Sequence, residues 1–545
     1  MKLKKIVLLA LVLVLLSAAV VVGFRRPAVA EGVIYIMADG SVMGTDKIQR
    51  DGNVYTFIDN LYGSIVVERD NIVVDGAGYV LQGTESEIGI ALSERINVSI
   101  RNMEIYGFFY GVYLLSSLNS NLTRNNIANN AIGICLTNSS NNNVSGNNIT
   151  YNRIEGILFD GSSNNNVSGD NIKNNSNGIG LSQSSNNAIN ENNVTGNIYY
   201  GIWLSGSSNN MFRNNDVDNN KYNFGVYGSL MQEFIQDIDD SNTANGKPVY
   251  YWVNRQDVAV PLDAGWVALV ICTGITVKDL NITNNGQGIL LAHTTDSTIT
   301  KNNITNNYNG IWLLGSSDNA INENRVTENT GCGIYLYYSS NNAFFHNYFI
   351  NNSRQVSTYE SDGVWDNGVA GNYWSDYEDR YPNATELDGS GIWNTPYVID
   401  EDNQDNYPLT NPIVIPAVPD TTPPAISIVS PKNNTYIAND VSLIFAVSEP
   451  TSWIGYSLDG QTIVAITENT TLVGLSDGSH SLKVYAKDAA GNTGASETIY
   501  FSIKTQQSEP FPVTWIVATI VIIAMVGAVL LAYFAKVKKI AQKAE

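Results

Sequence analysis

The sequence is poor in cysteine, histidine and basic residues. Its 545 residues include three cysteines, three histidines and 30 lysines and arginines, against 51 aspartates and glutamates. Three cysteines do not build a disulfide framework. Neither they nor His293, His346 and His480 have the spacing of a metal site. The net charge of −21 argues against nucleic acid or an anionic membrane surface as a partner.

Long amphipathic patterns are also lacking. Within the repeats, the apolar residues occur in islands of three or four, whereas a helix needs about ten periodic residues. Instead, a glycine returns every 22 or 23 residues in two stretches: Gly111, Gly133, Gly156, Gly178 and Gly201, then Gly265, Gly288, Gly310 and Gly333. A fixed period of this length is typical of a solenoid. Three short strands per unit predict a right-handed parallel β-helix with a coil rise of about 4.8 Å.

Asparagine follows the same period. It stands two residues before the third apolar position of most units, with one aspartate in the series: Asn125, Asn147, Asp170, Asn192, Asn215, Asn302, Asn324 and Asn347. An asparagine amide tolerates turn geometry and can pair with the same amide in the coils above and below. The spacing therefore predicts an asparagine ladder along one corner of the solenoid.

The two ends of the chain predict export and anchoring. Residues 1–30 have early lysines, an apolar run and Ala28-Val29-Ala30, which is typical of a signal peptide, with an uncleaved anchor as the alternative. Residues 513–535 are uncharged and long enough to span a bilayer as a helix. The lysines of 536–545 predict a basic cytoplasmic tail. We expect a single-pass cell-membrane protein with a large ectodomain outside the cell.

Composition divides the ectodomain into an all-β series of parts. We expect the β-helix over 31–360 with an insertion at 228–263, where the period breaks. An aromatic and acidic cap region follows at 361–411, because an open solenoid end needs a cover. A proline-rich linker at 412–424 leads to alternating runs over 425–504, which predict an immunoglobulin-like β-sandwich.

One outward stripe is rich in aromatic residues. The third residue of each glycine-led strand should face solvent, and five of these positions are predicted to bind glycans by stacking on sugar rings: Tyr113, Trp203, Tyr227, Trp312 and Tyr335. Two other interpretations stay open. The rings could pack under the 228–263 insertion, or they could reflect the strand preference of aromatic residues.

Carboxylates give weaker signals. Asp216 and Asp218 flank an inward valine and could face out together, as could Asp160 and Asp170. Paired carboxylates are the mark of glycoside hydrolysis, but single aspartates in asparagine-rich turns are usually structural. No catalytic residue is therefore predicted. No cofactor is predicted either, with Ca²⁺ bound by the acidic run at 400–405 as the alternative.

Several motifs carry a family resemblance. They are Asp75-Gly76-x-Gly78, the Gly-Ile-x-Leu coils, Asp237-Ile238-Asp239 with 246–252, and the segments 371–377 and 395–400. With these the chain resembles the NosD-like right-handed parallel β-helix family, whose repeats are grouped with carbohydrate-binding and sugar-hydrolase domains. The resemblance implies copper handling in nitrous-oxide reductase maturation. Residues 453–492 resemble immunoglobulin-like modules of archaeal surface proteins.

These observations favour an anchored surface protein that binds glycans or cell-envelope components in an adhesive or structural role over an enzyme. A polysaccharide lyase or glycoside hydrolase is the first alternative. A factor for copper or metalloenzyme maturation is the second.

Overall fold

The computed structural model describes residues 32–411 and 422–504. The chain divides into two compact units, one up to Ala425 and one from Ile426 onward. The predicted signal peptide, membrane helix and basic tail, and most of the linker, lie outside the described residues. Within the described ranges, no helix is long and apolar enough to cross a membrane.

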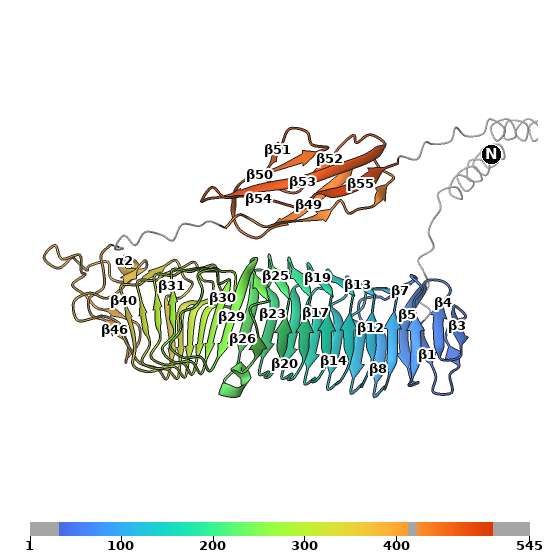
Figure 1. Ribbon diagram of the computed structural model, residues 1–545, viewed down its shortest axis with the longest axis horizontal. Helices are drawn as coiled ribbons and strands as arrows, with labels where there is room; N and C mark the ends of the chain where they lie inside the picture. The colour runs from blue at the N-terminus through green and yellow to red at the C-terminus, as the bar shows by residue number, and fades with distance from the viewer. Residues whose placement is uncertain (1–31, 412–421, 505–545) are drawn as a thin grey trace, which may run out of the picture. The chain divides into compact units, whose positions relative to one another are not determined.

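The first unit is a parallel β-solenoid, as predicted (Figure 1). Its N-terminal half stacks three ladders of short strands. Sheet A contains β1 (Gly32–Ile36), β5 (Leu61–Val67), β8 (Ile88–Ser93), β11 (Tyr110–Leu115), β14 (Ile132–Thr137), β17 (Glu155–Asp160), β20 (Asn177–Ser182), β23 (Tyr200–Ser205) and β26 (Tyr222–Tyr227). Sheet B contains β4 (Val54–Phe57), β6 (Ile72–Asp75), β9 (Val98–Arg101), β12 (Asn121–Thr123), β15 (Asn143–Ser145), β18 (Asn166–Ser168), β21 (Ala188–Asn190), β24 (Met211–Arg213) and β27 (Asp237–Ile238). Sheet C contains β7 (Val80–Gln82), β10 (Glu104–Tyr106), β13 (Asn126–Ala128), β16 (Asn148–Thr150), β19 (Asn171–Lys173), β22 (Asn193–Thr195), β25 (Asp216–Asp218) and β28 (Thr243–Ala244).

The C-terminal half repeats this plan. Sheet D contains β29 (Lys247–Val253), β30 (Trp266–Val270), β33 (Gln287–Ala292), β36 (Asn309–Leu314), β39 (Cys332–Tyr337) and β42 (Val356–Tyr359). Sheet E contains β31 (Thr276–Lys278), β34 (Thr298–Thr300), β37 (Ala320–Asn322), β40 (Asn342–Phe345) and β43 (Gly363–Val364). Sheet F contains β32 (Asn281–Thr283), β35 (Asn303–Thr305), β38 (Arg325–Thr327), β41 (Tyr348–Ile350) and β44 (Tyr373–Trp374).

Both ends of the solenoid carry extra strands. At the N-terminal end, β2 (Val42–Met43) pairs antiparallel with β1, and β3 (Ile48–Asp51) pairs antiparallel with β4. At the other end, α2 (Tyr377–Arg380), β45 (Tyr397–Val398) and β46 (Gln404–Asp405) cover the last coil. The ring of Trp374 there lies between Phe349 and Tyr397, with centroids 4.5 and 4.1 Å away.

The recurring glycine is explained by close backbone approach. Its φ is not in the left-handed region. A Cβ added to Gly156 would lie 2.7 Å from the carbonyl oxygen of Gly178 in the next coil and 2.9 Å from Cγ2 of Ile172. The next coil's backbone passes so near that any side chain would collide with it. The 22- or 23-residue rhythm therefore marks this contact, and not a turn.

The predicted asparagine ladder is confirmed. Asn125 Nδ2 donates to Asn147 Oδ1 at 3.0 Å in the next coil, and its other proton reaches the carbonyl of Ile100 in the preceding one. One row of asparagines is predicted from the sequence, whereas the structure has more. A second row includes Asn165 and Asn187, and a third includes Asn152 and Asn175. These amides satisfy backbone groups at the corners, where the strands end.

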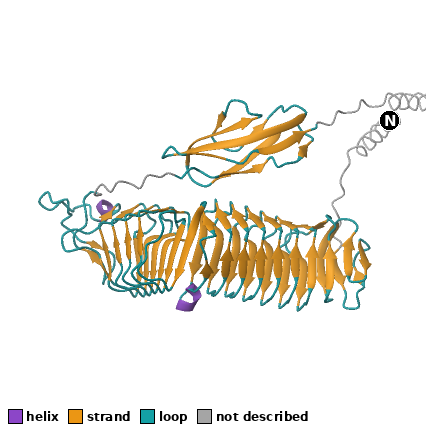
Figure 2. Cartoon of the chain, viewed as in Figure 1, coloured by secondary structure: helices purple, strands orange, loops and turns teal. Residues whose placement is uncertain are grey.

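The solenoid is interrupted after β26. The chain leaves sheet A, forms the short helix η1 (Met231–Phe234), and rejoins the coil as β27 and β28. β29 then pairs antiparallel with β28 and begins sheet D. The expected insertion at 228–263 is therefore too long, because β27, β28 and β29 continue the ladders. Figure 2 shows η1 and α2 as the two short helices of the described residues.

The second unit consists of two β-sheets around a common core. One sheet contains β47 (Ile426–Ser430), β49 (Val441–Val447) and β52 (Thr470–Leu472). The other contains β48 (Thr435–Tyr436), β55 (Ile499–Ile503), β53 (Gly478–Asp488), β50 (Thr451–Leu458), β51 (Val464–Ile466) and β54 (Thr493–Ala495). Leu443 from the first sheet and Leu482 and Phe501 from the second share its core. This arrangement is a β-sandwich, and its immunoglobulin-like character stays a prediction.

Candidate functional site

The predicted aromatic stripe is not one continuous row. Tyr113 and Trp203 share a row on the outer face of sheet A, through Cys135, Leu158 and Gly180. Both aromatic side chains are partly exposed. Their predicted role in glycan binding stays a prediction.

Tyr227 was assigned to the wrong row. Gly225 pairs with Trp203, and Tyr227 pairs with Ser205. The reason is that the repeat glycine is absent from this coil, where Asn223 takes its place between Tyr222 and Phe224. Counting from Gly225 shifted the register by two residues.

Trp312 was also placed wrongly, because it does not face solvent. It is only 5% exposed, and its ring lies 5.8 Å from those of Tyr227 and Phe234 and 5.7 Å from Tyr335. Phe234 belongs to η1, so this ring packs under the segment that interrupts the solenoid. Tyr335 stacks on the edge of the same cluster and is half-buried. These three residues of the predicted stripe therefore belong to a packed junction.

The junction joins the end of one solenoid half to the outer face of the next. Phe224 in the last strand of sheet A stacks on Trp266 of sheet D, with ring centroids 5.3 Å apart and planes 2° from parallel. Val226 N donates to the side chain of Gln287. Both faces of β30, β33 and β36 are consequently buried. The outward residues of sheet D are apolar because they cover the open end of the N-terminal core.

On sheet A, Trp203 lies flat along the surface. A Cβ added to Gly180 would lie 2.6 Å from Cε2 of the indole, so the ring rests directly on this glycine. The indole reaches across that coil and donates from Nε1 to Glu155 Oε1 at 3.3 Å, two coils away. Asn177 Nδ2 donates to the same oxygen at 2.9 Å. These contacts fix the orientation of the ring, and its outer side stays partly exposed.

Glu155 is a buried acid on an otherwise outward face. It is 5% exposed, beneath the indole and beside Ile132. Burial raises the pKa of its carboxyl to about 8. The hydrogen bonds from Asn177 and Trp203 lower this pKa, but by less than burial raises it. Glu155 is therefore protonated near pH 7. Glu155 could not be predicted from the sequence because its partner Trp203 is 48 residues away.

A second aromatic pair lies on the same face. The ring of Tyr113 stacks on Tyr110 with centroids 4.8 Å apart, and Phe109 meets Tyr110 edge to face. Both Tyr110 and Trp203 neighbour exposed apolar residues at the turn before each strand: Phe109, Ile154, Ile198 and Tyr199. This part of the N-terminal half presents aromatic surface over several coils.

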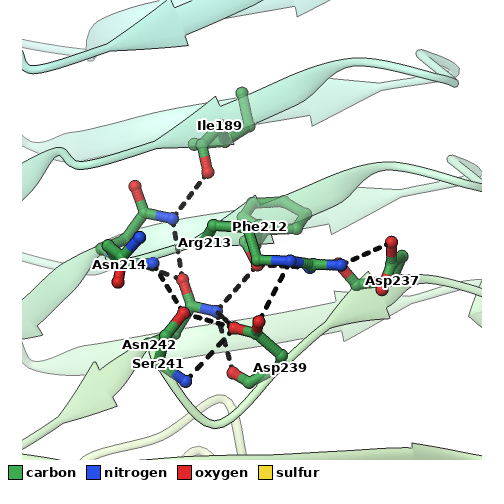
Figure 3. A network of polar contacts seen from close by, with 9 residues as sticks. Ile189, Phe212, Arg213, Asn214, Asp237, Asp239, Ser241 and Asn242 are labelled. Carbon is green, nitrogen blue, oxygen red and sulfur yellow. Dashed lines mark hydrogen bonds and ion pairs between the residues drawn. The ribbon is translucent and has the colours of Figure 1, made fainter.

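The motif that begins at Asp237 organises the turn at the junction. Figure 3 shows Arg213 held between Asp237 and Asp239, with ion pairs of 2.7 and 3.0 Å. Asn242 Nδ2 donates to the carbonyl of Phe212 at 2.9 Å, and Asn242 Oδ1 accepts from Asn215, so this residue continues the ladder. The carboxylates of Asp237 and Asp239 thus mainly stabilise this turn.

A cavity of about 560 Å³ lies beside this motif. It is lined by the segment Gln236–Asp240, by β29 from Val249 onward, and by Arg255, Val258, Ala259 and Pro261. Tyr250 and Trp252 pair with Val267 and Leu269, which are fully buried in the core of the C-terminal half. The two aromatic residues are only partly covered, because they belong to that half's first coil and no complete coil lies over them.

Of the four aspartates expected to face outward, one does not. Asp170 is not outward: it is 1% exposed and occupies a place in the asparagine ladder. Asp160 is exposed. Asp216 and Asp218 do share the outer face of sheet C, where burial and the nearby Asp216 raise the pKa of Asp218. Thr243 and the Gly246 amide bind this pair, which makes it part of the β28 turn.

The acidic run at 400–405 is also built into the fold. Asp405 is fully buried and accepts hydrogen bonds from Asn372 N at 2.7 Å, Trp374 Nε1 at 2.9 Å and Tyr407 N at 3.0 Å. Asp400 accepts from Thr358 and Asn403. The carboxylates thus bind different partners within the cap, and Ca²⁺ binding there stays an untested expectation.

Comparison with known families identifies the chain. A family model described as "Periplasmic copper-binding protein (NosD)" matches residues 47–249 and 263–379, more than half of the sequence. The chain belongs to the NosD family. The matched region of this NosD-family protein covers most of the solenoid and stops inside the cap.

Copper does not fit the described residues of this NosD-family chain. Residues 32–411 and 422–504 contain no group of three or more His, Cys, Asp or Glu side chains placed to hold a metal ion. His293, His346 and His480 lie on separate turns and units, and Cys135 and Cys272 are buried in the solenoid. His480 instead pairs with Asp459 at 2.7 Å.

Individual relatives share less with the chain. Halomucin of Haloquadratum walsbyi is 35% identical over 114 residues, which are 19% of this chain and 1% of halomucin. Among solved structures, the Azotobacter vinelandii mannuronan C-5 epimerase AlgE6 A-module is 12% identical, with 55% of this chain and 91% of that one covered and a TM-score of 0.32. PfbA, a surface adhesin of Streptococcus pneumoniae, is 12% identical over 53% of this chain and 82% of its own, with a TM-score of 0.28. Likenesses of this size do not bear on activity or substrate.

Proposed function

We propose that this protein binds an extended glycan along the outer face of sheet A, as a surface-anchored binding protein. The observation that carries the proposal is the fixed, flat indole of Trp203. A preorganised aromatic ring loses little entropy when a ligand stacks on it. The coil rise of about 4.8 Å is close to the length of one sugar unit, so a glycan could run along the coils.

A hydrolytic role is less well supported by the same site. Glu155 has the raised pKa of a general acid, but glycoside hydrolysis needs a second carboxylate within about 10 Å. The other outward carboxylate of β17, Asp160, is five residues along the strand, roughly 16 Å at about 3.3 Å per residue. Binding without cleavage therefore accounts better for the arrangement.

The experiment measures the affinity of the purified ectodomain for the polysaccharides that it retains on a glycan array. Trp203→Ala should weaken binding by about tenfold or more, the equivalent of about 1.4 kcal/mol. Trp453→Ala is a matched control, because Trp453 is a 37% exposed indole that lies over Gly455 in the other unit.

Three further variants test whether the fixed orientation matters. Gly180→Ala keeps the indole, but the added methyl group would push the ring away from the strand. This variant should also weaken binding. Glu155→Gln keeps an acceptor for the indole N–H and should retain binding, whereas Glu155→Ala should lose it. Unchanged affinity in both Trp203→Ala and Gly180→Ala would refute the proposal.

A further inference from the structure

The cavity at the junction is independent of the face that carries Trp203. It lies between the last coil of the N-terminal half and the first coil of the C-terminal half. Its volume of about 560 Å³ is within the range of small-ligand sites, about 300 to 1,000 Å³. It is also the place where the solenoid's interior is left partly uncovered.

The floor of the cavity is aromatic. Tyr250 and Trp252 meet edge to face, with ring centroids 6.0 Å apart and planes at 72°. In later coils the equivalent residues are aliphatic and fully buried, such as Val267 and Leu269. Two angled rings at an open mouth offer both a stacking surface and the negative π-faces that attract a cation.

The rim of the cavity is mainly acidic. Three of the lining residues are aspartates and one is arginine. Arg213 pairs with both Asp237 and Asp239, and its single positive charge offsets one of their two negative charges. Asp240 is exposed and has no ion pair among the described residues. The Tyr250 hydroxyl donates to Asp263 at 3.0 Å, which adds another carboxylate beside the rings.

We propose that this cavity binds a hexosamine unit whose amino group is free and charged. The sugar ring would stack on Trp252 and Tyr250, and its ammonium group would face Asp240. Arg255 at the rim would donate to ring hydroxyls. A uronic acid would be repelled by the aspartates, and N-acetylation would remove the charge that they favour. The proposal shares the assumption of a carbohydrate ligand with the function proposed above, but it uses a different site.

Calorimetry on the ectodomain with three trisaccharides tests the proposal. Tri-glucosamine should bind at least tenfold more tightly than its N-acetylated form or cellotriose. Asp240→Asn should remove this preference, whereas Asp388→Asn, an exposed aspartate of the cap, should keep it. Val258→Trp at the exposed rim should block the cavity and abolish binding, while the melting temperature stays that of the parent protein.

The outcomes separate the two sites. Trp203→Ala should leave tri-glucosamine binding unchanged, and Asp240→Asn should leave array binding on sheet A unchanged. Equal affinity for tri-glucosamine and cellotriose would overturn the role of charge. Equal affinity for Nα-acetyl-lysine amide would overturn the role of the sugar ring, and binding that survives Val258→Trp would overturn the location.

Discussion

Asp170 is a carboxylate in a row of amides, and replacing it with asparagine should stabilise the solenoid. Its Oδ1 accepts from Asn147 N at 2.6 Å and from Asn147 Nδ2 at 2.9 Å. Its Oδ2 is buried and has no hydrogen-bond partner among the described residues. Where the row has asparagine, as at Asn192, the second side-chain atom donates to a carbonyl of the preceding coil, that of Val167 at 3.1 Å. Asp170→Asn would supply that missing donor.

The size of the effect follows from the pKa of Asp170. Burial raises this pKa from 3.8 to about 7, which means that the folded protein prefers the protonated acid. Below about pH 4 the acid is protonated in both the folded and the unfolded chain, so it costs nothing. Between pH 4 and 7 only the unfolded chain loses its proton, and stability falls by up to about 1.4 kcal/mol per pH unit. The cost then levels off above pH 7, at no more than roughly 4 kcal/mol.

We therefore expect Asp170→Asn to raise the free energy of unfolding by about 1 to 3 kcal/mol at pH 7.5 and by much less at pH 4. Urea unfolding of the ectodomain at the two pH values measures this. Asp296→Asn is the control, because Asp296 is an exposed aspartate on a coil turn with φ of 52°, a conformation that asparagine tolerates. An equal gain at both pH values, or no gain at pH 7.5, would show that the buried charge is not the cause.

Two other substitutions test the coil contact and the cap. Gly156→Ala should destabilise the protein by about 1 to 3 kcal/mol, since its methyl group would strike the next coil; Gly169→Asn, at an open turn with φ of 65°, should change the urea midpoint little. Asp405→Asn should instead destabilise, by about 1 to 3 kcal/mol. Burial raises the pKa of Asp405 to about 7, as it does for Asp170, but both oxygens of Asp405 accept hydrogen bonds, Oδ2 from Asn372 and Trp374 and Oδ1 from Tyr407. An NH₂ group in place of either oxygen would therefore face a donor. Thermal melts at neutral pH measure this loss, and an Asp405→Asn melting temperature equal to that of the parent would contradict it.

The solenoid could be predicted from the sequence because each coil contacts only its neighbours. The close approach at Gly156 and the amide pairing at Asn125 recur in most coils, so their residues recur at a fixed spacing. The period in the sequence thus results from contacts between neighbouring coils. The period alone was enough to predict a solenoid, whereas the close approach that requires the glycine is seen only in the structure.

The junction could not be predicted because it is not periodic. Trp312 occupies an outward position by strand alternation, and alternation does not tell whether another part of the chain covers that face. Strand alternation also fails to predict the burial of Glu155, because the indole of Trp203 lies over it. Contacts between coils that are not adjacent do not recur at a fixed period, so the sequence shows no pattern for them. The prediction for Tyr227 was wrong for a related reason. Asn223 replaces the repeat glycine from which positions along each strand are counted.

Two of the family motifs lie where the stack of coils stops being regular. The motif at 237–252 turns the chain from one solenoid half into the next, and the motif at 371–377 supplies Asn372 and Trp374 to the cap. A repeat inside the stack needs only small, interchangeable residues, whereas an end needs particular residues to cover exposed backbone and core. These two motifs therefore specify how the solenoid halves are joined and how the last coil is covered. Trp203 lies inside the regular stack, at the variable position of a Gly-Ile-x-Leu coil, so the side chain there can change while the fold stays the same.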